Sequence, residues 1–497
     1  MSLLRGPHKK NIKIFLTIYF EIQSTLQSTM KHLLLIIASL SFSTLFYQQQ
    51  IGLNLSLFSI ITILILWWQN KSTISQTKTL LFVATYLITA IAVFINSSSL
   101  AIIANCISFF TLIGATSSYK TSIYIQWLNG IYTAVAGYFH RRLEPNEHKE
   151  QVIVKKEIDV LHWVKLIGIP LIFSITFILL YKNGNPIFSE IIEKIDFSFI
   201  NLHWILLTVL GFYLFNNLIQ PVTIEPATQT DLNTKNNLVP SENSSEEKLN
   251  KESQLGTVLL TLLNILIVFY IITDLSYLLS AANTTTAAHL SIQLHNGINA
   301  LIASILVAII TIILFFRGDL NFYKKNKMIK SLTYVWILLN VILVALIAIK
   351  NLDYSTSFGF TYKRIGVLVY LVLTLVGLIT TFYKVFSIKN LWYLFRINTQ
   401  LAFAMIVVCS AVNWDKTITN FNINHAVLLD MDYLINLSNS NAIILKEHAS
   451  HSKLSTVIET RINTKFKNYT EAIEARNWQE FTLINFKEDL HLKTNTH

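Results

Sequence analysis

The sequence predicts an all-α fold: a polytopic transmembrane helix bundle of about eleven spans with a small C-terminal helical extramembrane tail. Three observations support this fold class. Of the 497 residues, 53% are hydrophobic and only 13% are charged, and the mean hydropathy is +0.49. Soluble proteins carry roughly 25% charged residues, so this chain lacks the charge to cover a water-exposed surface. The same figures exclude disordered chains and coiled coils, and the presence of only 2 Cys excludes a disulfide-rich scaffold.

Apolar runs of the length that crosses a bilayer, about 20 residues, recur along the chain. Each must be helical, because lipid offers the backbone no hydrogen-bond partner. Gly and Pro are scarce, and we find no pair of Gly/Pro interruptions of the kind that marks transporters with broken helices. The runs predict spans at 33–47, 51–68, 78–96, 98–115, 160–181, 201–219, 255–276, 297–316, 331–349, 365–382 and 396–412.

The stretch 119–140 is ambiguous, because it is apolar and aromatic but contains Gln126, Asn129 and Gly130. Lys and Arg accumulate in cytoplasmic loops. If the stretch does not span and the N-terminus is inside, the inner loops hold 18 Lys and Arg and the outer loops hold 5. A twelfth span would move the five charges of 317–330 outside. We therefore expect an interfacial helix or a shallow re-entrant segment here, with a spanning helix as the open alternative.

The order of apolar and polar segments predicts five regions. Residues 1–29 precede Met30-Lys31-His32-LLLIIASL, which resembles a membrane-protein start, so we expect them to be a non-native N-terminal extension. Polar residues 221–253 predict a disordered cytoplasmic linker between an N-terminal half of six spans, 30–220, and a C-terminal half of five spans, 254–412. Residues 413–497 show apolar positions at helical spacing, and the odd number of spans places this tail outside.

Polar side chains inside a membrane are costly, so each is a candidate functional residue. Asp274 lies near the outer end of its span, and His295 and Arg364 begin the eighth and tenth spans on the same side. Together with Thr361 they form a candidate outer-face polar cluster. The alternative is that these charges merely extend to water.

Three mid-span asparagines are further candidates, and each either serves a function or joins helices by a hydrogen bond. They are Asn105, Asn264 and Asn340. The sequence contains no Walker loop, GxGxxG, HExxH or GxSxG motif, and Glu447, His448 and His451 lack zincin spacing. We therefore predict no catalytic residue, cofactor or metal site. Loop topology explains the net charge of +11 without nucleic acid as a partner.

Three short motifs resemble those of a known family. They are FGFTYKRI at 358–365, NWDKTI at 413–418 and LDMDYLINL at 429–437. They are similar, in order and spacing, to motifs of an uncharacterised bacterial multi-pass membrane family, domain of unknown function 4153/4173, and the match covers 255–445. The resemblance implies a protein of the bacterial inner membrane, and with the loop charges it implies a cytoplasmic N-terminus and a periplasmic tail. It implies no activity.

The leading functional interpretation is a non-enzymatic envelope scaffold, sensor or accessory subunit, which contacts the lipid bilayer and, through its tail, other envelope proteins. One alternative is a transporter of a small or lipidic substrate, which needs a midplane cavity lined by Asn264, Asn340 or Asp274. A second is a membrane-embedded transferase, which needs an outer pocket that gathers His295 and Arg364.

Overall fold

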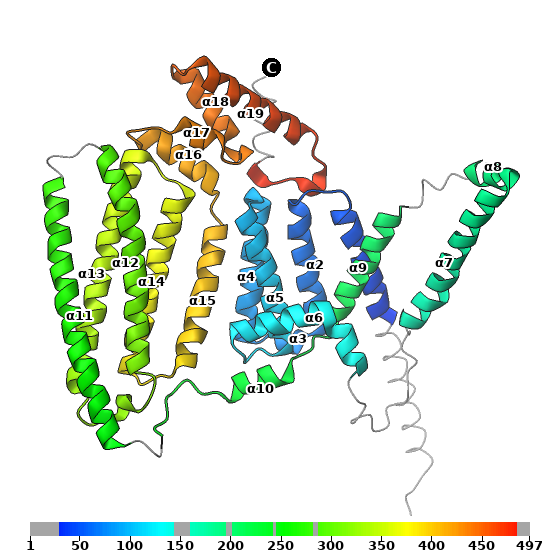
Figure 1. The fold of residues 1–497 in the computed structure, drawn as a ribbon. Helices are drawn as coiled ribbons and strands as arrows, with labels where there is room; N and C mark the ends of the chain where they lie inside the picture. Colours follow the sequence, from blue (N-terminus) through cyan, green and yellow to red (C-terminus); the bar gives the residue numbers. More distant parts are fainter. Residues whose placement is uncertain (1–28, 144–159, 195–200, 242–244, 282–286, 485–497) are drawn as a thin grey trace, which may run out of the picture. The chain divides into compact units, whose positions relative to one another are not determined.

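The computed structural model describes residues 29–143, 160–194, 201–241, 245–281 and 287–484, and it is built from helices. In these ranges the only β-type pairing is an isolated bridge between Asn237 and Lys389. The predicted extension at 1–29 lies almost wholly outside the described residues. The chain divides into two compact units, formed by 1–47 with 136–216 and by 48–135 with 217–497. Figure 1 shows the helices of both units.

The first unit contains the helix Thr29–Phe46, the end of α6, and three further helices: α7 (Val160–Gly184), α8 (Pro186–Lys194) and α9 (Leu202–Ile219). Thr208 on α9 donates a 2.8 Å hydrogen bond to Ser43 Oγ on the first helix. Asn201, just before α9, donates to the Tyr47 hydroxyl. These polar contacts hold the first helix against α9.

The second unit begins with four helices whose ends meet in short turns: α2 (Leu53–Gln69), α3 (Lys71–Ile74), α4 (Thr77–Asn96) and α5 (Ser99–Ser117). Helix α6 (Ile123–Leu143) follows and lies across α4 and α5 in Figure 1. Helices α5 and α6 cross closely because each has a glycine at the crossing. A Cβ on Gly114 of α5 would lie 1.8 Å from the Gln126 carbonyl oxygen, and one on Gly130 of α6 would lie 1.9 Å from that of Phe110.

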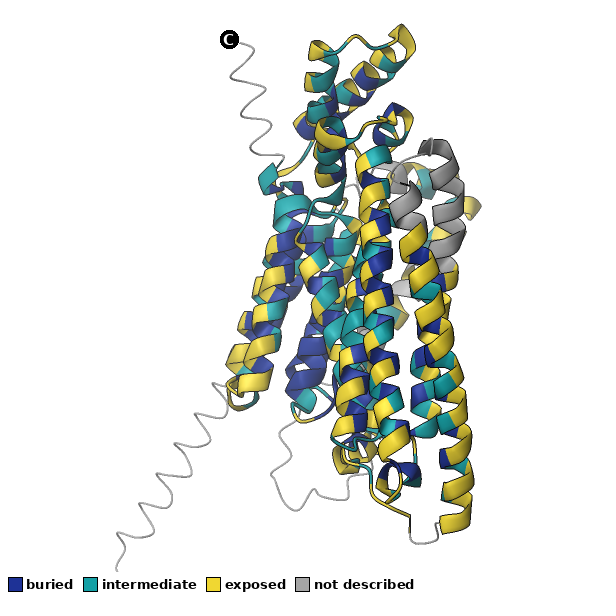
Figure 2. Cartoon of the chain, turned by 90° about the vertical axis from the view of Figure 1, so that its left-hand side faces the viewer, coloured by how far each residue is buried: buried dark blue, intermediate teal, exposed yellow. Residues whose placement is uncertain are grey.

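Five long helices form the rest of the bundle: α11 (Glu246–Ala281), α12 (Ala287–Phe315), α13 (Lys327–Phe358), α14 (Tyr362–Phe386) and α15 (Leu391–Ser410). The 3₁₀ turn η1 (Asp319–Phe322) lies between α12 and α13. One apolar core of Leu, Ile, Val and aromatic side chains joins α11 to α14. Figure 2 shows buried residues on the inner sides of these helices and exposed residues along their outer sides. Many exposed side chains are Leu, Ile, Val and Phe, as on a surface that faces lipid.

Within the described ranges, eight helices are long and apolar enough to cross a membrane, so the chain is a membrane protein with an all-helical fold. A helix lies at each of the eleven predicted positions. Two further apolar segments are shorter than these eight helices: α2, at 17 residues, and Ala300–Phe315 of α12. Helix α6 is not among the eight. The count of about eleven therefore stays a prediction.

Residues 217–241, named here the strap, differ from the disordered linker that the sequence predicts for 221–253. They include a helix, α10 (Glu225–Asn233), and α11 already begins at Glu246. The strap is ordered because α6 supplies hydrogen bonds to its backbone and side chains. Thr133 Oγ1 donates to the Val222 carbonyl over 3.0 Å, and Asn129 accepts from Ile224 N over 2.9 Å. The polar composition of residues 221–241 thus reflects a hydrogen-bonded interface with α6, whereas it had been interpreted as exposure to solvent.

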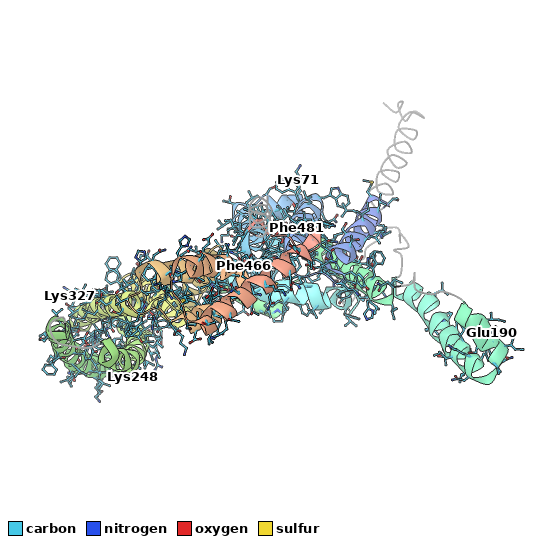
Figure 3. The ribbon with its side chains drawn as sticks, turned by 90° about the horizontal axis from the view of Figure 1, so that it is seen from above. Lys71, Glu190, Lys248, Lys327, Phe466 and Phe481 are labelled. Carbon is cyan, nitrogen blue, oxygen red and sulfur yellow. The ribbon has the colours of Figure 1, made fainter. Side chains whose placement is uncertain are left out.

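The C-terminal tail consists of helices, as the apolar spacing predicts. They are α16 (Trp414–His425), α17 (Met431–Ile435), η2 (Asn439–Asn441), α18 (Ala442–His451), α19 (Thr456–Glu474) and η3 (Trp478–Glu480). Its core continues into the bundle, because Ile365 in the first turn of α14 packs with Ile418, Leu434 and Ile462. The tail and the strap lie at opposite ends of the second unit's long helices (Figure 1). Seen from above, α19 with Phe466 runs over these helices toward Phe481 (Figure 3).

Candidate functional site

A polar pocket lies where the tail meets the ends of the bundle helices, and we name it the junction pocket. Its volume is about 540 Å³. Its walls come from the α4–α5 turn, the start of α14, the start of α16, the loop before η2 and the end of α19. The lining residues are Asn96, Ser97, Ser98, Ser99, Leu100, Tyr362, Asn413, Trp414, Asp415, Ser438, Asn439, Ser440, Tyr469, Ala472 and Arg476.

Local chain geometry places the serines of the α4–α5 turn at this pocket. Ser97 has φ +41°, a left-handed conformation that ends α4, and Ser98 then caps α5 by accepting a 3.2 Å hydrogen bond from Ala101 N. Asn96 accepts from Ser98 N over 2.9 Å. Three hydroxyl-bearing residues thus follow one another at the end of a bundle helix.

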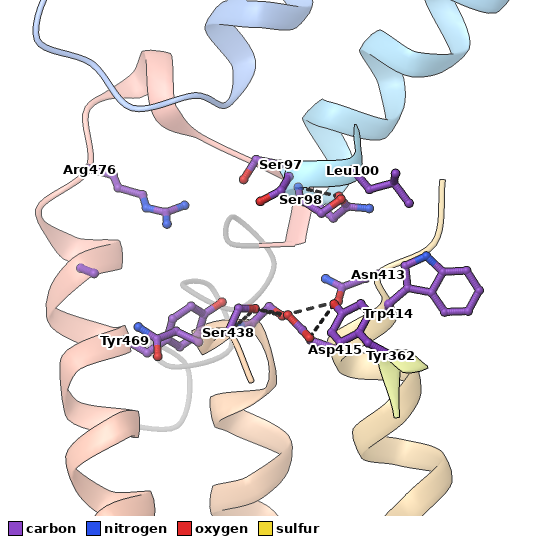
Figure 4. A pocket seen from close by; sticks show the side chains of 15 residues that line it. Ser97, Ser98, Leu100, Tyr362, Asn413, Trp414, Asp415, Ser438, Tyr469 and Arg476 are labelled. Atoms are coloured by element: carbon purple, nitrogen blue, oxygen red, sulfur yellow. Dashed lines mark hydrogen bonds between the residues drawn. The ribbon is translucent and has the colours of Figure 1, made fainter. Parts of the chain in front are cut away.

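Asp415 organises the opposite wall. Its Oδ1 accepts a 2.7 Å hydrogen bond from the Tyr362 hydroxyl, and its Oδ2 accepts one from Ser438. Ser440 lies 3.0 Å from Ser438 and donates to Asn413 Oδ1, the cap of α16, over 3.4 Å. Figure 4 shows this chain of hydrogen bonds along the lower wall. The carboxylate is therefore held in place between the bundle and the tail.

Arg476 supplies the pocket with an uncommitted positive charge. Its guanidinium points into the space between Ser97 and Ser98 on one side and Ser438 on the other (Figure 4). It makes no side-chain hydrogen bond or ion pair to any residue that the structure describes. The junction pocket therefore combines a guanidinium, hydroxyls, amides and the aromatic rings of Tyr362, Trp414 and Tyr469.

The loop before α14 fixes the tail beside this pocket. Gly359 turns the chain at φ +76°, and Thr361 caps α14 by accepting from Arg364 N over 3.3 Å. Asn422 on α16 clamps Phe360 at both backbone groups, with a 2.5 Å bond from Phe360 N and a 3.0 Å bond to its carbonyl. The motif residues therefore join the bundle to the tail.

Arg364 serves the same loop. Its guanidinium donates to the carbonyls of Phe358 (3.0 Å) and Gly359 and lies 4.2 Å from the Tyr354 ring centroid. Asp274 has another partner, because it forms a buried ion pair with Lys350 of α13. The predicted outer cluster is thus divided between two sites, and the His295 side chain lies outside the described residues. Lys350, which the sequence places in an outer loop, is buried inside α13.

The three asparagines are buried and hydrogen-bonded. Asn105 donates to Ser59 Oγ on α2 over 3.1 Å and to Thr89 on α4 over 3.4 Å, so it joins three helices. Asn264 donates to the Leu332 carbonyl of α13 over 3.1 Å. Asn340 donates to the Trp336 carbonyl over 2.7 Å and borders an apolar cavity of about 470 Å³ between α11, α12 and α13.

A second polar network lies on the strap, and sequence reasoning did not find it. Asp231 of α10 accepts from Ser122 N at 2.7 Å, from Tyr124 at 2.8 Å and from Arg396 Nη2 at 2.9 Å. Burial raises the pKa of the Asp231 carboxyl, but the hydrogen bonds from Ser122, Arg396 and Tyr124 outweigh it and bring the pKa below its usual value. The Arg396 guanidinium also donates to the carbonyls of Thr234 and Asp231.

A buried lysine of the tail lies at the end of α17. Lys465 of α19 donates to the carbonyls of Ile435 (2.8 Å) and Leu437 (2.7 Å), which close the α17 turn. Burial lowers its pKa to about 8. In the described ranges no group of three His, Cys, Asp or Glu side chains is placed to hold a metal ion.

Comparison with known proteins returns one family. The model of the domain of unknown function DUF4153 matches residues 34–448. No curated protein and no solved structure matches the chain.

Proposed function

The chain belongs to the DUF4153 family, a family of domains of unknown function. From its sites we propose that it is a non-enzymatic sensor or accessory subunit of the bacterial envelope. In this proposal it binds a small polar ligand in the junction pocket. The single observation that carries this proposal is Arg476, whose guanidinium has no partner among the described residues and is directed into a pocket that bundle and tail build together.

The lining favours binding over catalysis. The described residues that line the junction pocket include no His, Cys or Lys, and Asp415 accepts hydrogen bonds from Tyr362 and Ser438. Nucleophilic and acid–base mechanisms need a nucleophile beside a free base. Hydroxyls, amides and aromatic rings beside a guanidinium suit a hydroxyl-rich molecule with an anionic group, such as a phosphorylated sugar or headgroup.

The position of the pocket couples ligand binding to the bundle. A ligand that contacts Arg476, just after α19, and Ser98, the N-cap of α5, bridges the tail and a membrane helix. A ligand shifts a conformational equilibrium by its difference in affinity for the two states. Occupancy would therefore favour the arrangement in which α19 stays over α5, and this is how an envelope sensor would transmit a signal to its spans.

The predicted topology places the junction pocket on the periplasmic side, which an accessibility experiment tests. Asn439 lines the pocket and is exposed, so Asn439→Cys in a chain with Cys106 and Cys409 replaced by Ser offers one labelling site. A membrane-impermeant maleimide is expected to label it in intact cells. Labelling that appears only after permeabilisation would place the pocket on the cytoplasmic side and refute an envelope ligand.

Ligand binding itself is tested with glucose 1-phosphate as the probe. We expect the probe to slow maleimide labelling of Asn439→Cys. Arg476→Gln should raise the probe concentration that gives half-maximal protection about tenfold, as for a lost charge-assisted hydrogen bond. Arg461→Gln is the matched control, because Arg461 lies on α19, the helix that Arg476 follows, and pairs with Asp432 outside the pocket. Equal protection in both variants would remove Arg476 from the binding site.

A transporter of a lipidic substrate is the second candidate, and the apolar cavity beside Asn340 favours it. Flux of a fluorescent lipid in proteoliposomes would test it directly. The transferase alternative has less support, because the Arg364 guanidinium is bound to loop carbonyls and does not line the junction pocket.

A further inference from the structure

The connection from α12 to α13 carries a dense group of positive charges, and we name residues 316–330 the basic turn. Its five cations are Arg317, Lys324, Lys325, Lys327 and Lys330. The first four are exposed and form no ion pair with any residue that the structure describes. Asp319 is the only acid of the basic turn, and its Oδ1 already accepts a 2.8 Å hydrogen bond from Ser241 N of the strap. The cations are therefore left without a counter-charge of their own.

Two asparagines hold the backbone of the basic turn in place. Asn321 donates to the Phe316 carbonyl over 2.8 Å, and Asn326 donates to the carbonyls of Leu320 (3.0 Å) and Asn321 (2.8 Å). Leu320 is buried between them in the chain and packs into the core of the bundle. The cations therefore project from a fixed scaffold, and a ligand does not have to order the loop before it binds.

A sixth cation supports the basic turn from the protein interior. Lys384 of α14 is completely buried, and its Nζ donates to the Phe316 carbonyl. No carboxylate among the described residues pairs with it. Charges act more strongly where water is excluded, so Lys384 adds to the positive potential of the basic turn without touching a ligand there.

Exposed apolar side chains lie among these cations. Phe322 and Met328 are 37% and 62% exposed. Helix α12 ends at Phe315, and α13, one of the eight long apolar helices, begins at Lys327. The basic turn therefore lies where the chain leaves the apolar layer. A mixture of basic and apolar side chains at that level fits the boundary between lipid headgroups and acyl chains.

We propose that the basic turn binds the headgroup of an anionic phospholipid. Its exposed lysines contact the lipid phosphate, and Phe322 and Met328 lie against the upper part of the acyl chains. A soluble anion would pair with the lysines but leave the two apolar side chains in water, so the exposed Phe322 and Met328 favour a lipid. Accumulation of lysine in inner loops explains the side of the membrane, whereas the missing counter-charge calls for an anion. The site is separate from the junction pocket and does not depend on the function proposed for that pocket.

Fluorescence quenching by labelled lipids tests the proposal on the full-length protein in vesicles. Ser331 is exposed and lies one turn after Lys327 on α13. Ser331→Cys, in a chain with Cys106 and Cys409 replaced by Ser, carries a bimane fluorophore. The quenchers are phosphatidylglycerol and phosphatidylcholine, each with a nitroxide near the headgroup end of one acyl chain, in vesicles that otherwise contain phosphatidylcholine.

Phosphatidylglycerol is expected to reach half-maximal quenching at a mole fraction about tenfold lower than phosphatidylcholine. One cation near an anionic surface contributes roughly fivefold, and salt screens part of the effect of several exposed cations. Lys324→Gln combined with Lys325→Gln should bring the two lipids to within about twofold of each other. Lys71→Gln combined with Lys78→Gln is the matched control and should keep the tenfold difference. These two lysines are also exposed, and the sequence places them in an inner loop, but they lie outside the basic turn.

Equal quenching by the two lipids would overturn the proposal. An equal loss of preference in both double variants would overturn it as well, because the charge of the whole membrane face would then attract the lipid. Reversal of phosphatidylglycerol quenching by free glycerol phosphate, but not by sodium chloride at the same ionic strength, would make the basic turn a site for a soluble phosphate ester. If the Lys324 and Lys325 variant fails to fold, the comparison of the two lipids on the chain with both lysines decides the question.

Discussion

Replacing Asp231 by Ala is expected to release the strap from the bundle. The substitution removes the carboxylate that accepts hydrogen bonds from Ser122, Tyr124 and Arg396. It leaves the Arg396 guanidinium without its charged partner, although that side chain is only 14% exposed. An uncompensated buried charge is the chief cost of breaking such a pair.

The size of the loss in unfolding free energy depends on the hydrogen bonds that Arg396 retains. Loss of one partner of a buried ion pair destabilises proteins by about 3–5 kcal/mol. The guanidinium retains the carbonyls of Thr234 and residue 231 and the Asn236 side chain, which compensate part of its charge. We therefore expect about 3 kcal/mol for Asp231→Ala, at the lower end of the range.

Unfolding of the purified protein in mixed micelles with increasing SDS content measures this cost, and a double-mutant cycle isolates the pair. Asp231→Ala, Arg396→Met and the double variant should show a coupling free energy of about 1.5–3 kcal/mol. Additive effects, within about 0.5 kcal/mol, would refute the reasoning. Lys251→Ala, which breaks an exposed pair with Glu247, is the control and should cost less than about 0.5 kcal/mol.

Three further predictions concern the tail and the helix crossing. Burial lowers the pKa of Lys465 to about 8, so between pH 8 and about 10.5 the unfolded chain binds more protons than the folded chain. The stability of the tail should therefore rise with pH across this range. Lys465→Met should abolish the rise, as measured by resistance to proteolysis. Gly130→Ala forces a Cβ against the Phe110 carbonyl and should lower stability by about 1–3 kcal/mol in the same SDS titration, whereas Gly366→Ala, with open space around it, should not. Arg364→Met should free the loop before α14 and speed protease cleavage there by about tenfold, and unchanged cleavage would contradict a role in fixing the tail.

Hydropathy predicted the helices well because a span must satisfy its own backbone hydrogen bonds, so each apolar run determines its own structure. The helical spacing of the tail was informative for a similar reason. The non-spanning prediction for 119–140 is compatible with α6, which lies across α4 and α5 and is not among the eight apolar helices.

Pairs of charges were harder to predict, because their partners lie far apart in the sequence. Asp231 is in a polar segment and Arg396 begins an apolar run 165 residues later. An arginine inside a predicted span is itself a signal for a buried partner, and it could have directed attention to this network. Nothing in the sequence pairs Asp274 with Lys350, since the choice depends on how α11 packs on α13.

The end of the tail closes the start of α2. Leu53 N donates to the Phe481 carbonyl over 2.9 Å, and Gln50 N donates to Glu480 Oε1 over 2.8 Å, across 430 residues of sequence. The ribosome therefore makes the two acceptors more than 400 residues after the two donors. The start of α2 therefore enters the membrane before its hydrogen-bond acceptors exist, and a chain that stops before Trp478 would leave the backbone N–H groups of Gln50 and Leu53 without these acceptors.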